Sequence, residues 1–402
     1  METAGIVAGR VRRAGGTAGV AGAILLLSAC GPGAPTVPPP LPPPPVESAA
    51  PTVAGETDRL GWPAPPLPDS DGILDSPMLR HPGFQAEVER WVEFWRTRGA
   101  AWFPEYLERM SWFAPTVDRA LAEAGLPASL RYLPIVESGY SPRAVSSARA
   151  VGLWQLMAPT ARQLGVGVSR LVDGRRDPFR STEAATAFLA ELHARFGSWF
   201  LALSAYNAGP GRVQRILNRH APLRPRTDSL WWEIRPHLPR ETRDFVPKLF
   251  AAARIAAAPD LHGFDPLPEP RDFAFEEVEV PDATTLDVVA RAAESPQAEI
   301  ERLNPQVVRG ITPADQATTL RVPAGKGETF RRNYALIPPS ERVTFVEHRV
   351  RSGETLTHIA VRYGIRLREL EDANPALRPR YLQIGQRIVV PVAPSALRQS
   401  GG

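Results

Sequence analysis

The sequence predicts a mainly α-helical body followed by two small modules, each folding as strand, helix, helix, strand. The body extends from about Pro82 to Leu261, where apolar residues recur at helical spacing and strand-like alternation is hard to find. After Asp265 the pattern changes, because short alternating segments now enclose short helical ones, and this order occurs twice. We therefore expect one α domain and two copies of a small βααβ module.

Three helices of the body show the pattern most clearly. Ser181–Phe196 places its apolar side chains on one helical face, with Ser181 as the expected N-cap and Gly197 as the expected C-cap. Trp199–Ala208 is almost wholly apolar and stops at a Gly-Pro-Gly sequence, so we expect a buried central helix. A further helix is expected over about 242–258. Together these segments predict a helical core.

The N-terminal end resembles that of a bacterial lipoprotein. A short basic segment precedes a small and apolar run over residues 14–29, which is too short for a comfortable transmembrane span and is typical of an export signal. The run ends at Cys30, the only cysteine, in a Leu-Ser-Ala-Cys sequence that resembles a lipobox. The resemblance implies that Cys30 is lipidated and anchors the chain in a membrane. With Gly31 after the cysteine, it further implies an outer-membrane lipoprotein facing the periplasm of a Gram-negative bacterium. The alternative is an ordinary secretory signal with a chance cysteine.

The chain divides into segments by composition. Residues 30–81 are dense in proline, which predicts an extended tether rather than a core. The expected division is a lipoprotein signal peptide at 1–29, the tether at 30–81, the catalytic domain at 82–262, small modules at 273–325 and 346–392, and a tail at 393–402.

Charge and histidine spacing exclude some classes of function. The 402 residues carry 47 basic and 43 acidic side chains, a net charge of +4, with both signs interspersed. This balance does not predict a nucleic-acid partner, which calls for a clustered basic surface. The seven histidines fit no zinc-ligand spacing, so we expect no metal and no cofactor. The sequence leaves the oligomeric state open.

Glu137 is the candidate catalytic residue. It follows an apolar helical run and precedes Gly139, which is expected to end the helix. Both the negative end of the helix dipole and apolar neighbours favour the protonated form of a carboxyl group. A raised pKa is what a general acid for glycoside cleavage needs near neutral pH. The alternative is a solvated or salt-bridged glutamate at a helix end.

Polar side chains at the end of the apolar helix raise a related question. Tyr206 and Asn207 need hydrogen-bond partners if they are buried, and so does Gln155 in its Gly-Leu-Trp-Gln stretch. One interpretation is structural, with the side chains satisfying loop carbonyls. The other is that they present a hydroxyl and an amide to the N-acetyl group of a sugar.

Five stretches in this order, at 133–142, 144–146, 152–157, 205–209 and 241–248, resemble the soluble lytic transglycosylase (SLT) domain of the goose-type lysozyme-like fold. The similarity covers about residues 85–262. It implies a peptidoglycan lytic transglycosylase in which Glu137 is the sole catalytic carboxylate. The resemblance assigns substrate binding to Ser146, Gln155, Met157, Tyr206 and Asn207.

The resemblance also implies a mechanism. Glu137 protonates the bond between N-acetylmuramic acid and N-acetylglucosamine, and the muramyl C6 hydroxyl then closes on C1 to give a 1,6-anhydro end. A goose-type muramidase using water is one alternative and would need a second carboxylate, for which Asp173 or Asp177 are candidates. A catalytically inactive wall-binding lipoprotein is another. Two residues depart from the family pattern, because Arg149 replaces a glycine and Phe245 replaces a tyrosine.

The second small module resembles a LysM domain. A Gly-Glu-Thr turn precedes an amphipathic helix over 356–363, for which Gly364 is the expected C-cap. The resemblance implies binding to peptidoglycan glycan strands; the individual residues either contact the glycan or only shape turns. The candidate glycan-binding residues are Gly353, Thr355, Leu356, Ile384 and Gly385. The first module lacks the Gly-Glu-Thr turn and is expected to be a degenerate LysM-like unit.

Overall fold

The computed structural model describes residues 72–271, 273–314, 316–343, 345–374, 377 and 382–391. All of them fall within one compact unit of the chain. The expected signal peptide, Cys30, the expected tether as far as residue 71 and the C-terminal tail lie outside these residues. The last ten residues of the expected tether are described, and Ile73 and Met78 among them are buried in the core of the helical body. Among the residues described, no helix is both long and apolar enough to cross a bilayer.

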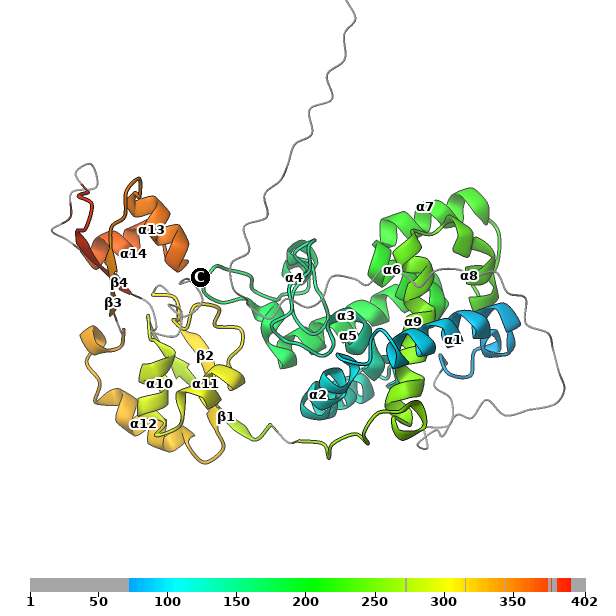
Figure 1. The fold of residues 1–402 in the computed structure, drawn as a ribbon, viewed down its shortest axis with the longest axis horizontal. Coiled ribbons are helices and arrows are strands. Elements are labelled where there is room, and N and C mark those ends of the chain that lie inside the picture. The colour runs from blue at the N-terminus through cyan, green and yellow to red at the C-terminus, as the bar shows by residue number, and fades with distance from the viewer. Residues whose placement is uncertain are drawn as a thin grey trace, which may run out of the picture. The chain divides into compact units, whose positions relative to one another are not determined.

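The helical body is confirmed, and a mainly α architecture with it (Figure 1). Its most buried helix is α6, which packs against α5, α7, α8 and α9, so the nearly all-apolar sequence of α6 matches its central position. The helices of the body are α1 (Pro82–Arg96), α2 (Phe103–Glu123), α3 (Leu133–Ser138), α4 (Ala158–Gln163), α5 (Pro178–Phe196), α6 (Trp199–Ala208), α7 (Pro210–His220), α8 (Asp228–Ile234) and α9 (Arg240–Ala257).

The start of α5 differs from the expectation. The N-cap is Asp177, not Ser181, because the Asp177 carboxylate accepts hydrogen bonds from the backbone N–H groups of Phe179 and Arg180. Pro178 occupies the first helical position, where its missing N–H costs nothing. Gly197 ends the helix in a left-handed conformation, as predicted.

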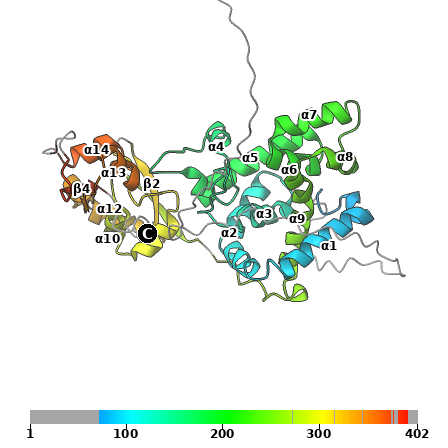
Figure 2. The same cartoon turned by 45° about the horizontal axis from the view of Figure 1, so that its top comes forward.

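Two small modules follow the body, and each contains the predicted order of strand, helix, helix, strand (Figure 2). The strands pair antiparallel within each module. The first module also includes α12 (Gly327–Ala335), which the sequence analysis did not assign and which places Phe330 and Tyr334 in the same core. The other elements are β1 (Phe275–Val280), α10 (Leu286–Ala292), α11 (Gln297–Leu303), β2 (Thr318–Pro323), β3 (Phe345–Arg349), α13 (Leu356–Tyr363), α14 (Leu367–Asp372) and β4 (Arg387–Pro391).

One asparagine in each module ties a helix to the last strand. Asn304 donates to the carbonyls of Ile300 and Arg321 and accepts from the Arg321 N–H. Asn374 makes the same three bonds, to the carbonyls of Leu370 and Val389 and from the Val389 N–H. The two modules are therefore built on one plan, which explains why their sequences show the same order of signals.

Candidate active site

A cavity of about 720 Å³ opens in the helical body, a volume typical of a ligand-binding site. Residues of α1, α2, α3, α6 and α9 line it, together with the segment between α3 and α4. The six residues predicted from sequence for this site all line the cavity, namely Glu137, Ser146, Gln155, Met157, Tyr206 and Asn207. Segments far apart in the sequence thus converge on one space.

Glu137 occupies the last turn of α3, which ends at Gly139 in a left-handed conformation. Burial, together with the charge of Glu241, raises the pKa of Glu137 to about 8, and the charge of Lys248 partly opposes this shift. The apolar neighbours Ile135 and Val136 line the same cavity. The carboxyl group is therefore protonated at neutral pH, as a general acid must be.

Tyr206 and Asn207, at the end of α6, have defined partners. The Tyr206 hydroxyl donates to the Trp154 carbonyl at 2.7 Å, which is the structural role considered for it. Burial and the Glu137 carboxyl raise the pKa of Tyr206, so its hydroxyl stays neutral. The Asn207 carbonyl oxygen accepts from Thr242 at 2.7 Å, and its amide donates to Glu241 at 3.4 Å. These bonds fix both side chains where they border the cavity.

The segment between α3 and α4 supplies the predicted lining residues Ser146, Gln155 and Met157, and part of its backbone is unusual. Ser146 accepts a hydrogen bond from the Ala150 N–H at 3.0 Å, and the Gln155 amide donates to the Gly152 carbonyl at 2.9 Å. Gln155 has a positive φ of 47°, a conformation that side chains rarely adopt. Met157 lines the cavity and is 42% exposed. Strained backbone of this kind is typical of functional sites.

Helix α9 contributes a charged face to the site. Its stretch 241–248 is one of the five that resemble the SLT domain, but Glu241 and Lys248 were not predicted as site residues. Glu241, Phe245 and Lys248 line the cavity and are spaced four and three residues apart, which places them on one side of a helix. Burial lowers the pKa of Lys248, while Asp244, Glu241 and Glu137 oppose this shift. The helical spacing within the Glu-Thr-Arg-Asp-Phe stretch was the signal available for finding these residues.

Three aromatic side chains were also missed. Trp91 and Trp95 of α1 and Tyr106 of α2 line the cavity, and the Lys248 ammonium lies 4.3 Å from the centre of the Trp91 ring. All three are almost wholly buried and belong to the core of the body. No local motif marks these residues, because only the tertiary packing of α1 and α2 brings them to the site. Trp231, by contrast, is fully buried and donates to Ser204, so it has a packing role.

The aspartates considered as a second carboxylate for a muramidase do not line the cavity. Asp173 is buried and paired with Arg175 at 2.8 Å. Asp177 caps α5 and is paired with Arg321 at 2.9 Å. Both carboxylates have structural partners, which corrects their assignment as candidates.

The five candidate glycan-binding residues of the second module fall into three groups. Thr355 is the N-cap of α13, and Leu356 packs in the module core at 3% exposure, which favours turn-shaping roles. Gly353 and Gly385 have positive φ values of 78° and 83° and open space where a Cβ would stand. Ile384 is 72% exposed, so it is the residue of this set available for an apolar contact.

In the part of the chain that the structure describes, no three His, Cys, Asp or Glu side chains lie close enough together to hold a metal ion. The carboxylates that do lie at the cavity are Glu137 and Glu241. The chemistry available at this site is therefore that of a protonated carboxyl group with a charged helix face beside it.

Comparison with known proteins assigns three regions of the chain. The Transglycosylase SLT domain family matches residues 117–226, the family described as "Lytic transglycosylase MltD, LysM-like domain" matches 274–339, and the LysM domain family matches 348–391. The SLT match contains Glu137 and the lining residues of α6. The match at 274–339 also includes α12.

Individual relatives carry the same names. Membrane-bound lytic murein transglycosylase D of Escherichia coli is 31% identical over 302 residues, which are 72% of this chain and 64% of that protein. Membrane-bound lytic murein transglycosylase F of Alcanivorax borkumensis is 31% identical over 119 residues, covering 27% and 24% of the two chains. The solved structure of an inactive mutant of lytic transglycosylase Slt from Pseudomonas aeruginosa is 28% identical, with a TM-score of 0.31 and coverage of 39% and 25%.

The matches agree with the resemblance found in the sequence. They cover the catalytic candidate, the first module and the second module in the same order. The chain therefore contains a region that matches the Transglycosylase SLT domain, followed by regions that match a LysM-like domain and a LysM domain.

Proposed function

We propose that this protein is a lytic transglycosylase that cleaves the bond between N-acetylmuramic acid and N-acetylglucosamine in peptidoglycan and leaves 1,6-anhydro ends. The observation that supports this most is the position of Glu137 in the cavity with a pKa raised to about 8. The SLT domain match over the same residues supports the substrate class. The chain spans 64% of the length of the Escherichia coli relative, so the activity is proposed from the site and the domain matches together.

In the proposed reaction Glu137 acts twice. Its proton passes to the glycosidic oxygen as the bond to C1 breaks, and the substrate's N-acetyl oxygen stabilises the positive charge at C1. The ionised carboxylate then takes the proton of the muramyl C6 hydroxyl, whose oxygen bonds to C1. Protons balance over the cycle, no water is consumed, and Glu137 returns to its starting state. Ser146, Gln155, Met157, Tyr206 and Asn207 are proposed to line the bound sugar.

The second candidate function is hydrolysis by a muramidase, and the position of Glu241 is the observation that supports it. Glu241 is a second carboxylate at the same cavity, and its charge acts on Glu137. A hydrolase could use such a group to activate water. The hydrogen bond from Asn207 to Glu241 supports the simpler role of holding the end of α6 in place.

The products of sacculus digestion test the proposal. Purified sacculi digested by the wild-type protein are expected to release muropeptides with anhydro ends, each one water lighter than a hydrolytic product, as read by mass spectrometry. Glu137→Gln is expected to release none. Reducing ends alone would overturn the transglycosylase proposal in favour of the muramidase.

We also propose that the LysM domain binds the glycan strand through its exposed turn residues, and that lipidated Cys30 anchors the chain in the outer membrane. The lipobox-like sequence supports the anchor, and the printed name of the Escherichia coli relative describes that protein as membrane-bound. Residues 82–262, 273–325 and 346–392 are the proposed domain division. α12 adds to the middle module as far as Ala335.

Ile384→Ser is expected to weaken sacculus binding roughly tenfold, because the loss of one exposed apolar contact is worth about 1–2 kcal/mol. The Tm should not change, since the side chain is 72% exposed. A pull-down with sacculi measures the effect. Val361→Ser removes an exposed aliphatic side chain from α13 and is the matched control. Equal binding by Ile384→Ser and wild type would contradict the assignment of this turn.

A further inference from the structure

The LysM-like module is joined to the catalytic domain by backbone pairing. The Asp173 N–H donates to the Gln306 carbonyl at 2.9 Å, and the Val308 N–H donates to the Leu171 carbonyl at 2.8 Å. The residues between these partners form an antiparallel bridge. The segment 171–173, which lies just before α5, is thereby held by the module.

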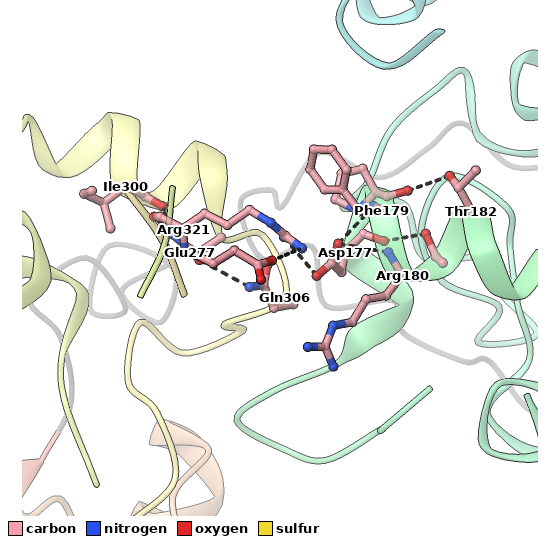
Figure 3. A network of polar contacts seen from close by, with 11 residues as sticks. Asp177, Phe179, Arg180, Thr182, Glu277, Ile300, Gln306 and Arg321 are labelled. Carbon is pink, nitrogen blue, oxygen red and sulfur yellow. Dashed lines mark hydrogen bonds and ion pairs between the residues drawn. The ribbon is translucent and has the colours of Figure 1, made fainter. Parts of the chain in front are cut away.

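A buried ion pair reinforces this junction (Figure 3). Arg321 on β2 is 4% exposed, and its Nη1 donates to the Asp177 carboxylate at 2.9 Å. The guanidinium carbon lies 4.5 Å from the centre of the Phe179 ring and 5.1 Å from that of Phe275, and Glu277 lies 3.5 Å from Nη2. Because Asp177 caps α5, the module touches the residue that begins a core helix of the catalytic domain.

Comparison of the two modules shows that the docking residue is particular to the first. The bonds of Asn304 and Asn374 place Arg321 and Val389 at the same structural position. Val389 in the LysM domain is 39% exposed, whereas Arg321 is buried against the catalytic domain. A charged group is buried only where partners compensate for the lost water. The outward face of β2 therefore packs against the catalytic domain, whereas the same face of the LysM domain is partly exposed.

Hydrogen bonds lead from the docked segment to the cavity. Asp173 binds Arg175 through two bonds of 2.9 and 2.8 Å, and Arg175 Nη1 donates to the carbonyls of Arg149 and Leu156 at 3.1 Å each. Arg149 has a positive φ of 64°, as strained as that of Gln155 nearby. Such conformations persist only where the surrounding structure holds them.

We propose that the LysM-like module is a fixed support for the cavity wall, and that Arg321 is a positioning residue that holds Ser146, Gln155 and Met157 in place through the segment 171–177. The module then contributes to the geometry of catalysis rather than to the capture of glycan. A displacement of reacting groups by about 1 Å is enough to cost up to a hundredfold in rate. The proposal concerns the activity proposed above, although its first test does not depend on that activity.

Hydrogen exchange of the full-length wild-type protein is the first test. We expect the docking amides of Asp173 and Val308 and the cavity-wall amides of Ala150 and Leu156 to open together, with protection factors within about tenfold of one another. The amide of Val350, in the LysM domain, is the internal comparison and should open independently. Docking amides that exchange a hundredfold faster than the cavity-wall amides would overturn the proposal, because the wall would then persist without its support.

Substitution of Arg321 is the second test. In the full-length chain, Arg321→Met is expected to lower kcat for release of soluble muropeptides about tenfold, to leave the half-saturating sacculus concentration unchanged, and to speed exchange at Ala150 and Leu156. Arg321→Lys should restore part of the rate. Arg331→Met, which removes an exposed arginine of the same module, is the matched control and should behave as wild type.

The outcomes separate cleanly. A folded Arg321→Met protein with the kcat and the exchange rates of wild type would overturn the support role. If this variant does not fold, the exchange of the wild type decides. An inactive wild type would contradict the proposed function and would leave the exchange test of the module in force.

Discussion

Glu137→Gln is expected to reduce the release of muropeptides by roughly a thousandfold or more, because one group supplies both the acid and the base of the proposed reaction. The amide has nearly the same shape as the carboxylic acid but can neither give up nor take a proton in this cycle. Release of soluble products from sacculi measures the rate. Glu183→Gln changes an exposed glutamate of α5 and is the matched control, with an expected rate equal to that of wild type.

The same variant should be more stable than wild type at alkaline pH. Folding raises the pKa of Glu137 from 4.5 to about 8, so between these values the native state holds a proton that the unfolded state has released. Native stability therefore falls as pH rises through this window. The loss of stability approaches about 5 kcal/mol above pH 8, and it is smaller to the extent that water enters the cavity.

Urea unfolding at pH 5 and at pH 8.5 measures this difference. Wild type should lose stability relative to Glu137→Gln between the two values, while Glu183→Gln should follow wild type. A stability difference between wild type and Glu137→Gln that does not depend on pH would contradict a protonated carboxyl group at this position in the cavity. Loss of activity without this signature would indicate that Glu137 has another role.

Gly152→Ala is expected to destabilise the catalytic domain by about 3 kcal/mol or more. Gly152 has a φ of 86°, and a Cβ there would lie 1.8 Å from the carbonyl oxygen of Arg175. A side chain in this backbone region costs about 1–2 kcal/mol by itself, and the overlap adds to it. The neighbour is backbone of a residue held by its pair with Asp173, so it cannot move aside cheaply.

The matched control for this prediction is Gly165→Ala. Gly165 also has a positive φ, of 77°, but nothing lies within 4 Å of the position of a Cβ. Its substitution should cost only about 1 kcal/mol by urea unfolding. Equal losses for the two variants would show that backbone strain alone, and not the close approach to Arg175, governs the site.

The sequence predicted correctly those helices whose ends are marked by an apolar run and a following glycine. The bounds of α6 and α13 agree with the expectation, because an apolar run and a glycine define each of them. The start of α5 was predicted wrongly. Asp177 and Pro178 lie before the apolar face of the helix begins, whereas Ser181 lies next to that face and was therefore chosen as the N-cap. α12 escaped notice because its role depends on a core formed by distant strands.

The candidate site divides in the same way. The residues carried by short motifs, such as Glu137 and Tyr206, lie together at the cavity as expected. Trp91 and Tyr106 reach it through long-range packing, which has no signature in one sequence. Arg321 is hidden for another reason: in the sequence it is one charged residue in an alternating strand, and only its burial against Asp177 reveals what it does.

The paired asparagines Asn304 and Asn374 carry an evolutionary consequence. Each fastens its module from the inside, through backbone atoms that any neighbouring residue would offer. The side chain at the fastened position is then free to change without loosening the module. A duplicated module of this kind can diverge on its outer surface without losing its fold. One copy can then become part of the catalytic domain's structure while the other copy keeps its original binding function.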